Sequence, residues 1–302
     1  MKVIIAQHTR VGKRPYNQDR VGHWSTSEAM LLVVADGMGG HAHGDVAAEL
    51  VMRHIAAAFR RDARPRLPDP DLFLFRAVGR SHGMLVREAV NLGLADTPRT
   101  TVVACVVQDG RAHWSHVGDS RLYLLRKGEV LVRTRDHTLV HKLVDEGRLQ
   151  ADDMSSHPDR NRLLQCLGGA ATPRIQPTAH ALLDKDDVLL LCSDGLWGPL
   201  TERQIVEGFA GAPLAEAVPR LAALAETQGG KGADNITALA LAWGEAMAAV
   251  SEGPRTVPRA EASTEAQDFG ATDPDFLRMT DEDIERAIEQ IKQALKRNVP
   301  PR

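Results

Sequence analysis

Apolar residues recur along the chain with two spacings, one typical of helices and one typical of strands. Residues 44–61 carry them at i, i+3, i+4 and i+7, which predicts an amphipathic helix, and a second helical stretch covers residues 71–92. Helices are also predicted at residues 201–209 and 214–227. Residues 136–168 are polar and predicted to be helical, as expected of a surface element.

Strand-like segments are short, apolar and often β-branched. They span residues 3–8, 31–36, 100–107, 112–117, 122–125, 130–132, 173–183, 188–192 and 236–243. Short Gly-containing turns join the strands between residues 100 and 132, so this region is predicted to be an antiparallel meander and not a repeated strand–helix–strand unit. Residues 10–20 are polar and rich in turn formers.

Three aspartates stand at the ends of predicted strands. Asp36 and Asp194 each end a long apolar run, and Asp234 precedes the last strand. A single Asp-Gly pair most often forms a turn. Three aspartates, each next to an apolar strand, favour one shared role for all of them. A cluster of hard oxygen ligands suits magnesium, manganese or calcium better than zinc.

Composition limits the possible classes of protein. With 302 residues, 43% hydrophobic and 25% charged, the chain is typical of one large or two small globular domains. The net charge of −3 gives no electrostatic case for nucleic acid as a partner. No apolar stretch reaches membrane-spanning length, and no signal-peptide pattern is found. The cysteines Cys105, Cys166 and Cys192 form no CxxC pair, so we expect reduced thiols in a cytoplasmic protein.

Carboxylates that converge from separate strands can hold two divalent ions about 4 Å apart with a shared water. Such ions lower the pKa of that water, so a hydroxide nucleophile exists near neutral pH. A phosphate ester is the natural substrate, because the ions also screen the phosphoryl oxygens and a nearby Arg can bind the phosphate. No cysteine-nucleophile motif is found. The residues therefore predict a metal-dependent hydrolase.

An ordered series of motifs carries a family resemblance. The series is Arg14-x-x-Asn17-Gln18-Asp19, residues 34–40 (VADGMGG), Thr100-Thr101, residues 118–121 (GDSR), Asp136-His137, residues 193–197 (SDGLW) and residues 234–237 (DNIT). It is similar, in content and order, to the PPM/PP2C-type metal-dependent Ser/Thr protein phosphatases, most closely to their bacterial branch. The resemblance covers roughly residues 1–243.

The resemblance implies an α+β fold: a four-layer αββα sandwich of two antiparallel β-sheets flanked by helix pairs, with a helical flap at about residues 137–168. It implies two Mn²⁺ or Mg²⁺ ions, with Asp36 bridging both and the Gly37 carbonyl on the first. Asp194 and Asp234 would complete the shell of the second ion, and Asp119, with Asp194, matches a third-metal site.

The resemblance also implies catalytic roles. Asp19 would act through metal-bound water to orient the nucleophile, and Arg14 would bind the phosphate. Attack would come directly from a metal-bridging water or hydroxide. Met38 is a departure, because eukaryotic members have at that position a His proposed as general acid. The general acid of this chain is left open.

Three hypotheses about function follow. In the first, the chain is an active phosphoserine/phosphothreonine phosphatase that opposes a bacterial Ser/Thr kinase. In the second, it is a catalytically weak sensor or scaffold of the same fold that acts through its C-terminal helix. In the third, the substrate is a small phosphorylated molecule. Retention of Asp36, Asp194 and Asp234 favours an active enzyme over the scaffold.

The C-terminal region differs from the rest of the chain. We expect a domain at residues 1–245, a flexible linker at residues 246–279 and an amphipathic helix at residues 280–298. Thr280 is a candidate N-cap, and apolar residues lie along one face of this helix. The helix could fold back on its own domain, bind a partner or self-associate.

Overall fold

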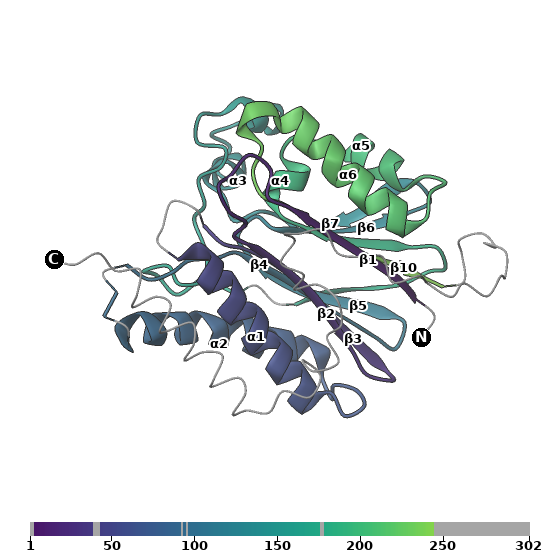
Figure 1. The fold of residues 1–302 in the computed structure, drawn as a ribbon, viewed down its shortest axis with the longest axis horizontal. Helices are drawn as coiled ribbons and strands as arrows, with labels where there is room; N and C mark the ends of the chain where they lie inside the picture. The colour runs from purple at the N-terminus through teal and green to yellow at the C-terminus, as the bar shows by residue number, and fades with distance from the viewer. Residues whose placement is uncertain (1–2, 39–42, 92, 95, 176–177, 245–302) are drawn as a thin grey trace, which may run out of the picture.

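The computed structural model describes residues 3–38, 43–91, 93–94, 96–175 and 178–244. Two antiparallel five-stranded sheets stack face to face, and helices cover their outer faces, which gives four layers (Figure 1). The α+β sandwich expected from the sequence is confirmed. The predicted linker at 246–279 and the predicted helix at 280–298 lie outside the described residues.

The first sheet contains both ends of the described domain. Its order is β1-β10-β9-β6-β7. The strands are β1 (Val3–Arg10), β10 (Ile236–Trp243), β9 (Val188–Cys192), β6 (Arg121–Arg126) and β7 (Glu129–Arg133). The first and last strands pair along their whole length, from Val3 opposite Trp243 to Arg10 opposite Ile236. This pairing places the loop after β1 beside the loop before β10.

The second sheet has the order β2-β3-β4-β5-β8. The strands are β2 (Asp19–Ser25), β3 (Ala29–Asp36), β4 (Val102–Gln108), β5 (Arg111–Val117) and β8 (Ala179–Leu182). The central strand β3 is apolar without interruption because both its faces are buried. Leu31, Val33 and Ala35 pack toward the helices, whereas Leu32 and Val34 pack toward the other sheet.

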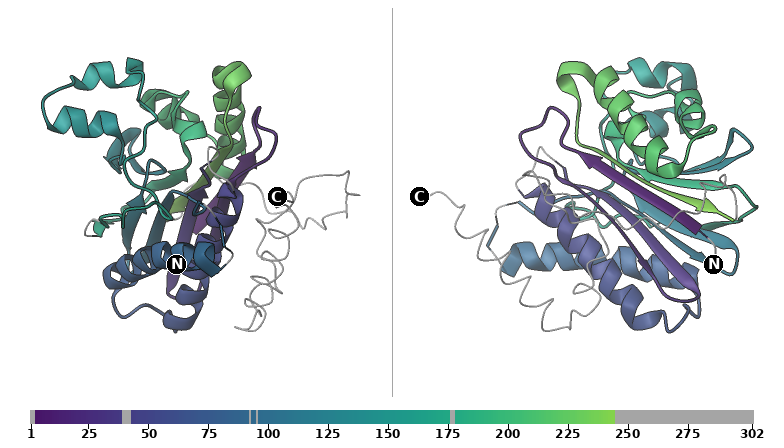
Figure 2. Two further views of the ribbon diagram at one scale, coloured as in Figure 1. Left: turned by 90° about the vertical axis from the view of Figure 1, so that its left-hand side faces the viewer. Right: turned by 45° about the vertical axis from the view of Figure 1, so that its right-hand side comes forward.

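Each sheet has its own helical layer, as the three views in Figures 1 and 2 show. The long helices α1 (Gly44–Asp62) and α2 (Pro70–Asn91) lie on the second sheet. The helices α4 (Asp194–Trp197), α5 (Glu202–Phe209) and α6 (Leu214–Gly229) lie on the first sheet. Thr201 begins α5 with a full capping box to Gln204, which satisfies backbone N–H groups at the start of the helix.

The predicted meander is wrong in one respect. Strands β4 and β5 form a hairpin in the second sheet, and β6 and β7 form a hairpin in the first, but β5 and β6 do not pair. The turn at residues 118–120 instead crosses between the sheets. Short turns alone do not reveal this, because a tight connection can join strands of one sheet or pass from one layer to the other.

Three local predictions also need correction. The polar segment after β1 leads into a strand, β2, which the sequence pattern did not suggest. Within the predicted helical region 136–168, only α3 (Leu139–Asp145) and the 3-10 helix η1 (Ala151–Ser156) are helical. The predicted strand at 173–183 shortens to β8 (Ala179–Leu182), and Pro173 cannot donate a ladder hydrogen bond. A last 3-10 turn, η2, covers Gly230–Gly232.

Among the helices that the structure describes, none combines the length and the apolarity required to cross a lipid bilayer.

Candidate active site

Both sheets contribute acids to one end of the sandwich. Asp36 ends β3 and lies directly opposite Asp19, the first residue of β2. Asp194 follows β9 and starts α4, and Asp234 precedes β10. Asp119 lies in the turn that crosses from β5 to β6. The fold therefore collects, at this end, acids that are up to 215 positions apart in the sequence.

Hydrogen bonds connect the two sheets at this end. The Ser193 hydroxyl donates to Oδ2 of Asp19 at 2.7 Å, and the backbone N–H of Thr237 donates to the Ser193 hydroxyl at 3.0 Å. Asp19 belongs to the second sheet, whereas Ser193 and Thr237 belong to the first. Ser193 therefore fixes the relative position of the two halves of the site.

Asn235 holds the polar loop between β1 and β2. Its side-chain oxygen accepts from the backbone N–H of Gln18 at 2.8 Å. Its side-chain nitrogen donates to the carbonyls of Val11 at 2.8 Å and Tyr16 at 3.1 Å. These three bonds satisfy backbone groups on both sides of Arg14 and so define the course of the loop that carries it.

The backbone of Asp36 is fixed by the Thr100-Thr101 pair. Its carbonyl accepts from the Thr100 hydroxyl and from the Thr101 N–H, each at 2.8 Å. At the next residue, a Cβ on Gly37 would stand 2.3 Å from the carbonyl oxygen of Gly44. Only glycine fits at residue 37, because the backbone at the start of α1 passes too close for a side chain.

Burial and mutual repulsion raise the pKa values of Asp36, Asp19, Asp194 and Asp119. Desolvation, followed by the charges of Asp19 and Asp194, raises the pKa of Asp36 well above its usual value. Desolvation raises the pKa of Asp19 to about 6, although the hydrogen bond from Ser193 opposes the shift. Desolvation and the Asp234 charge raise the pKa of Asp194 to about 7. The pKa of Asp119 is likewise raised by desolvation and by Asp194.

These features fit divalent cations with hard oxygen ligands. Oδ1 of Asp19 is buried and has no hydrogen-bond partner. Several buried carboxylates in mutual repulsion are stable as anions only with a counter-charge among them. Among the described residues, no three of these acids have ligand atoms that all lie within 4.8 Å of one another.

Arg14 lies at the solvent-exposed edge of the acidic cluster. Its Nη2 donates to Oδ2 of Asp234 at 2.6 Å, and half of its side-chain surface is exposed. This hydrogen bond is the main cause of the raised pKa of Arg14, and Asp194 and Asp36 add to it. A planar guanidinium in this place can bind an incoming phosphate through two parallel hydrogen bonds.

Further motif residues hold the Asp119 turn. Arg121 makes a bidentate pair with Asp136, at 2.8 and 2.7 Å, and its guanidinium lies 3.4 Å above the centroid of the Trp197 ring. The Trp197 indole N–H in turn donates to the Asp119 carbonyl at 2.9 Å. The turn that carries Asp119 is therefore anchored to α4, which begins with Asp194.

His137 supports the same turn from the other side. Its backbone N–H donates to the carbonyl of Gly118 at 2.9 Å, and its Nδ1 accepts from the Gly118 N–H at 3.2 Å. Desolvation and the neighbouring His116 lower the pKa of His137 to about 4, so the ring is neutral and Nδ1 is free to accept. Met38, the departure from the eukaryotic pattern, donates its backbone N–H to the carbonyl of Arg99.

Sequence reasoning named the acids but not the residues that position them. Ser193, Asn235, Arg121 and Asp136 all lie inside the quoted motifs, next to or near a named acid. Their presence in the motifs was a signal, but their partners come from the other sheet or from a distant loop. Periodicity along the chain contains no information on such pairs.

Comparison with known proteins agrees with this geometry. The family model described as Protein phosphatase 2C matches residues 6–239. The serine/threonine protein phosphatase PstP of Mycobacterium tuberculosis is 37% identical over 227 residues, which cover 74% of this chain and 41% of PstP. The chain thus spans less than half the length of that relative. The serine/threonine phosphatase stp of Listeria innocua is 32% identical over 229 residues, which cover 75% of this chain and 90% of stp.

Solved structures show the same similarity in three dimensions. A crystal structure of the catalytic domain of PstP in complex with two manganese ions superimposes with a TM-score of 0.68 at 31% identity. The superposition covers 80% of this chain and 97% of that one.

Proposed function

The chain belongs to the protein phosphatase 2C family and groups with its bacterial members, and we propose that it is a metal-dependent protein serine/threonine phosphatase. One observation carries this proposal: the two sheets bring buried carboxylates together around Asp36, with Arg14 at the edge of the cluster. Buried carboxylates in this arrangement require cations to offset their mutual repulsion. The adjoining Arg14 can bind the phosphate of a substrate.

Two Mn²⁺ or Mg²⁺ ions, bound here, would lower the pKa of water toward neutrality and screen the phosphoryl oxygens. We propose that Asp36, the Gly37 carbonyl, Asp194 and Asp234 would hold these ions, and that Asp119 would, together with Asp194, hold a further one. The manganese complex of the related catalytic domain supports two such ions.

The chain's own residues then have separate tasks. Asp19 has one oxygen occupied by Ser193 and the other free, so Oδ1 can accept a hydrogen bond from the attacking water and direct its lone pair at phosphorus. Arg14 can turn from Asp234 to the phosphate and hold its non-bridging oxygens. This assigns orientation to Asp19 and substrate binding to Arg14.

The test is hydrolysis of a phosphothreonine peptide by the metal-stripped chain, with and without MnCl₂. We expect activity only with metal, and Asp36→Asn should lower the rate by about 10²–10³-fold or more, since an essential charged group is lost. Asp109→Asn is the matched control: Asp109 is an exposed turn acid at positive φ, a conformation that Asn also tolerates.

Three outcomes would count against this proposal. Full activity in Asp36→Asn would exclude the metal assignment. Faster turnover of small phosphorylated molecules than of phosphopeptides would favour a metabolite phosphatase. Absence of turnover in the wild type with manganese bound would favour a sensor or scaffold.

Phosphoproteins are the substrates that the family relationship supports, and a Ser/Thr kinase that phosphorylates them is the corresponding partner. We place this pair in the cytoplasm. The three cysteines are free thiols, as expected of a reducing compartment. Dephosphorylation of proteins labelled by such a kinase would test the pairing.

A further inference from the structure

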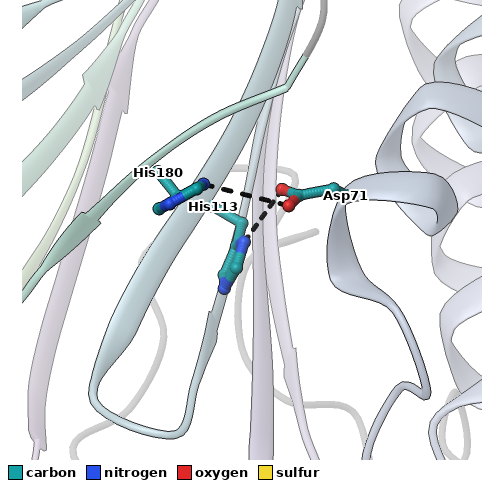
Figure 3. A group of neighbouring side chains, drawn as sticks. All are labelled: Asp71, His113 and His180. Atoms are coloured by element: carbon teal, nitrogen blue, oxygen red, sulfur yellow. Dashed lines mark hydrogen bonds and ion pairs between the residues drawn. The ribbon is translucent and has the colours of Figure 1, made fainter.

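A second group of metal-ligating side chains lies outside the acidic cluster. Asp71, His113 and His180 are the one set of three such residues, among those described, whose ligand atoms all lie within 4.8 Å of one another. Figure 3 shows both imidazole rings directed at the same carboxylate. We propose that these three residues form a zinc site, separate from the phosphatase centre and not required for its chemistry.

The distances match those of a shared metal. Nδ1 of His113 lies 2.9 Å from Oδ1 of Asp71, and Nδ1 of His180 lies 3.9 Å from Oδ2 of the same carboxylate. Ligands at about 2.0–2.1 Å from a tetrahedral zinc ion stand about 3.3 Å from one another, between these two values. Small rotations of the rings would bring both nitrogens and one carboxylate oxygen to zinc-bonding distance.

A hydrogen bond between His113 and Asp71 would by itself satisfy a buried histidine. It does not account for His180, whose ring nitrogen is too far from Asp71 for a hydrogen bond yet faces the second carboxylate oxygen. The two rings are also close to each other, with centroids 5.4 Å apart. Two imidazole nitrogens and one carboxylate around a point are a donor set that suits zinc.

Hydrogen-bonded secondary structure carries all three residues. His113 and His180 are directly paired between β5 and β8, and both lie in the register of an antiparallel ladder. Asp71 stands in the first turn of α2, where the carboxylate of Asp69 accepts from the Leu72 N–H and caps the helix. The Thr178 hydroxyl donates to the Asp71 carbonyl at 3.1 Å and ties the segment before β8 to this turn.

The site has one closed side and one open side. His113 is 9% exposed, and its neighbours Ala112 and Trp114 face the other sheet, so its ring points to the helix layer. Asp71 and His180 have 41% and 49% of their side-chain surface exposed. Zinc could therefore enter from solvent, and a water or an external ligand could take the fourth position.

The site is distant from the acidic cluster. In the ladders, His113 lies opposite Val106 and Val106 lies opposite Leu31, five residues before Asp36 on β3. With about 3.3 Å per residue along a strand and about 4.8 Å between strands, the separation is roughly 20 Å. Zinc at this site would act by joining the start of α2 to the short edge strand β8, and so would stabilise that corner of the sheet.

The first experiment uses the full chain, stripped of metal and then held in excess Mg²⁺ to occupy the hard oxygen ligands. Zinc is added in the presence of a chromogenic chelator, and stoichiometry and affinity are measured. We expect one equivalent per chain in the wild type. His180→Gln should weaken binding by more than the roughly 10–100-fold that loss of an indirect partner costs, because it removes a direct ligand.

His23→Gln is the matched control. His23 is a partly buried strand histidine of the same sheet, bonded through Nδ1 to Gln7 and outside the cluster. It should bind zinc as the wild type does. Equal stoichiometry and affinity in His180→Gln and His23→Gln would overturn the proposal.

A second readout is independent of the first. Zinc should raise the melting temperature of the wild type and of His23→Gln, but not that of His180→Gln, because only the first two gain a ligand bound to the native state. Co²⁺ substitution should give the absorption bands of a tetrahedral ion with the same dependence on residue 180. Because His180 is exposed, its replacement leaves the core intact. A zinc-induced shift that survives His180→Gln would count against the site.

Discussion

The acidic cluster around Asp36 and the zinc site at Asp71 are built in opposite ways. The first gathers carboxylates from two sheets and buries most of them, and the positive charges near them are those of Arg14 and Arg121. The second joins one carboxylate to two imidazoles within one sheet and its helix layer. A site made of like charges depends on ions for its stability, whereas a His–Asp pair is already satisfied by its own hydrogen bond.

The difference also determines which ion each site prefers. Carboxylates and a backbone carbonyl are hard oxygen donors that suit Mg²⁺ and Mn²⁺, whereas imidazoles shift the preference toward zinc. The two sites of one chain would then prefer different ions. The predictions below separate the two sites, from the largest expected effect to the smallest.

Neutralising one acid in each cluster should give the largest contrast. Asp194→Asn should lower manganese-dependent hydrolysis of a phosphothreonine peptide by about 10²–10³-fold, because it removes charge where the phosphoryl group reacts. Asp71→Asn should leave that rate within about twofold, because Asp71 stands roughly 20 Å away. Steady-state kinetics on both variants measures this. A comparable loss in Asp71→Asn would show that the two sites are coupled.

Removing the positive charge of Arg14 at the edge of the acidic cluster should have an intermediate effect on phosphatase activity. Arg14→Ala should reduce kcat/KM by about 10–100-fold, as expected for loss of hydrogen bonds to a charged group worth about 1.5–3 kcal/mol. Arg14→Lys should recover part of the loss, since the charge stays but the bidentate geometry does not. Zinc affinity at the Asp71 site should not change. An Arg14→Ala enzyme with wild-type kcat/KM would disprove phosphate binding by this residue.

The smallest effect is on the pH dependence of stability in the metal-free protein. The pKa values of Asp194 and Asp19, about 7 and about 6, are raised above the unfolded value of 3.8. The folded state thus binds more protons, and the stability from protonation is lost as pH rises through these values. Buried histidines with lowered pKa values act in the opposite direction, and their contribution continues to about one pH unit above their unfolded value of 6.5.

The comparison of the wild type with Asp194→Asn isolates the acid, because the histidines contribute to the pH dependence of both proteins. Between pH 6.5 and 8 we expect the metal-free wild type to lose about 0.5–1 kcal/mol of stability relative to Asp194→Asn. Denaturant unfolding of both proteins at constant ionic strength measures this difference. An equal pH dependence of stability in the two proteins would contradict the raised pKa of Asp194.

The sequence by itself determined the local elements and the identity of the acids. The bounds of α1, α2, α6 and β10 agree with the periodicity within about two residues, because a buried stripe requires a regular spacing of apolar side chains. The acids at strand ends could be predicted because a charged residue next to a long apolar run marks the point where a buried strand ends. The ordered motifs then indicated the family to which the chain belongs.

Only the tertiary structure decided how these parts meet. The crossing between sheets at residues 118–120, the bond between Ser193 and Asp19 and the loop held by Asn235 all join residues that are distant in the chain or in different layers. The zinc site is the extreme case, since residues 71, 113 and 180 form no sequence motif. The two histidines meet through strand register, and Asp71 joins them through the packing of α2 on the sheet. Local periodicity reflects which face of an element is buried, whereas pairing between elements depends on how the whole chain packs.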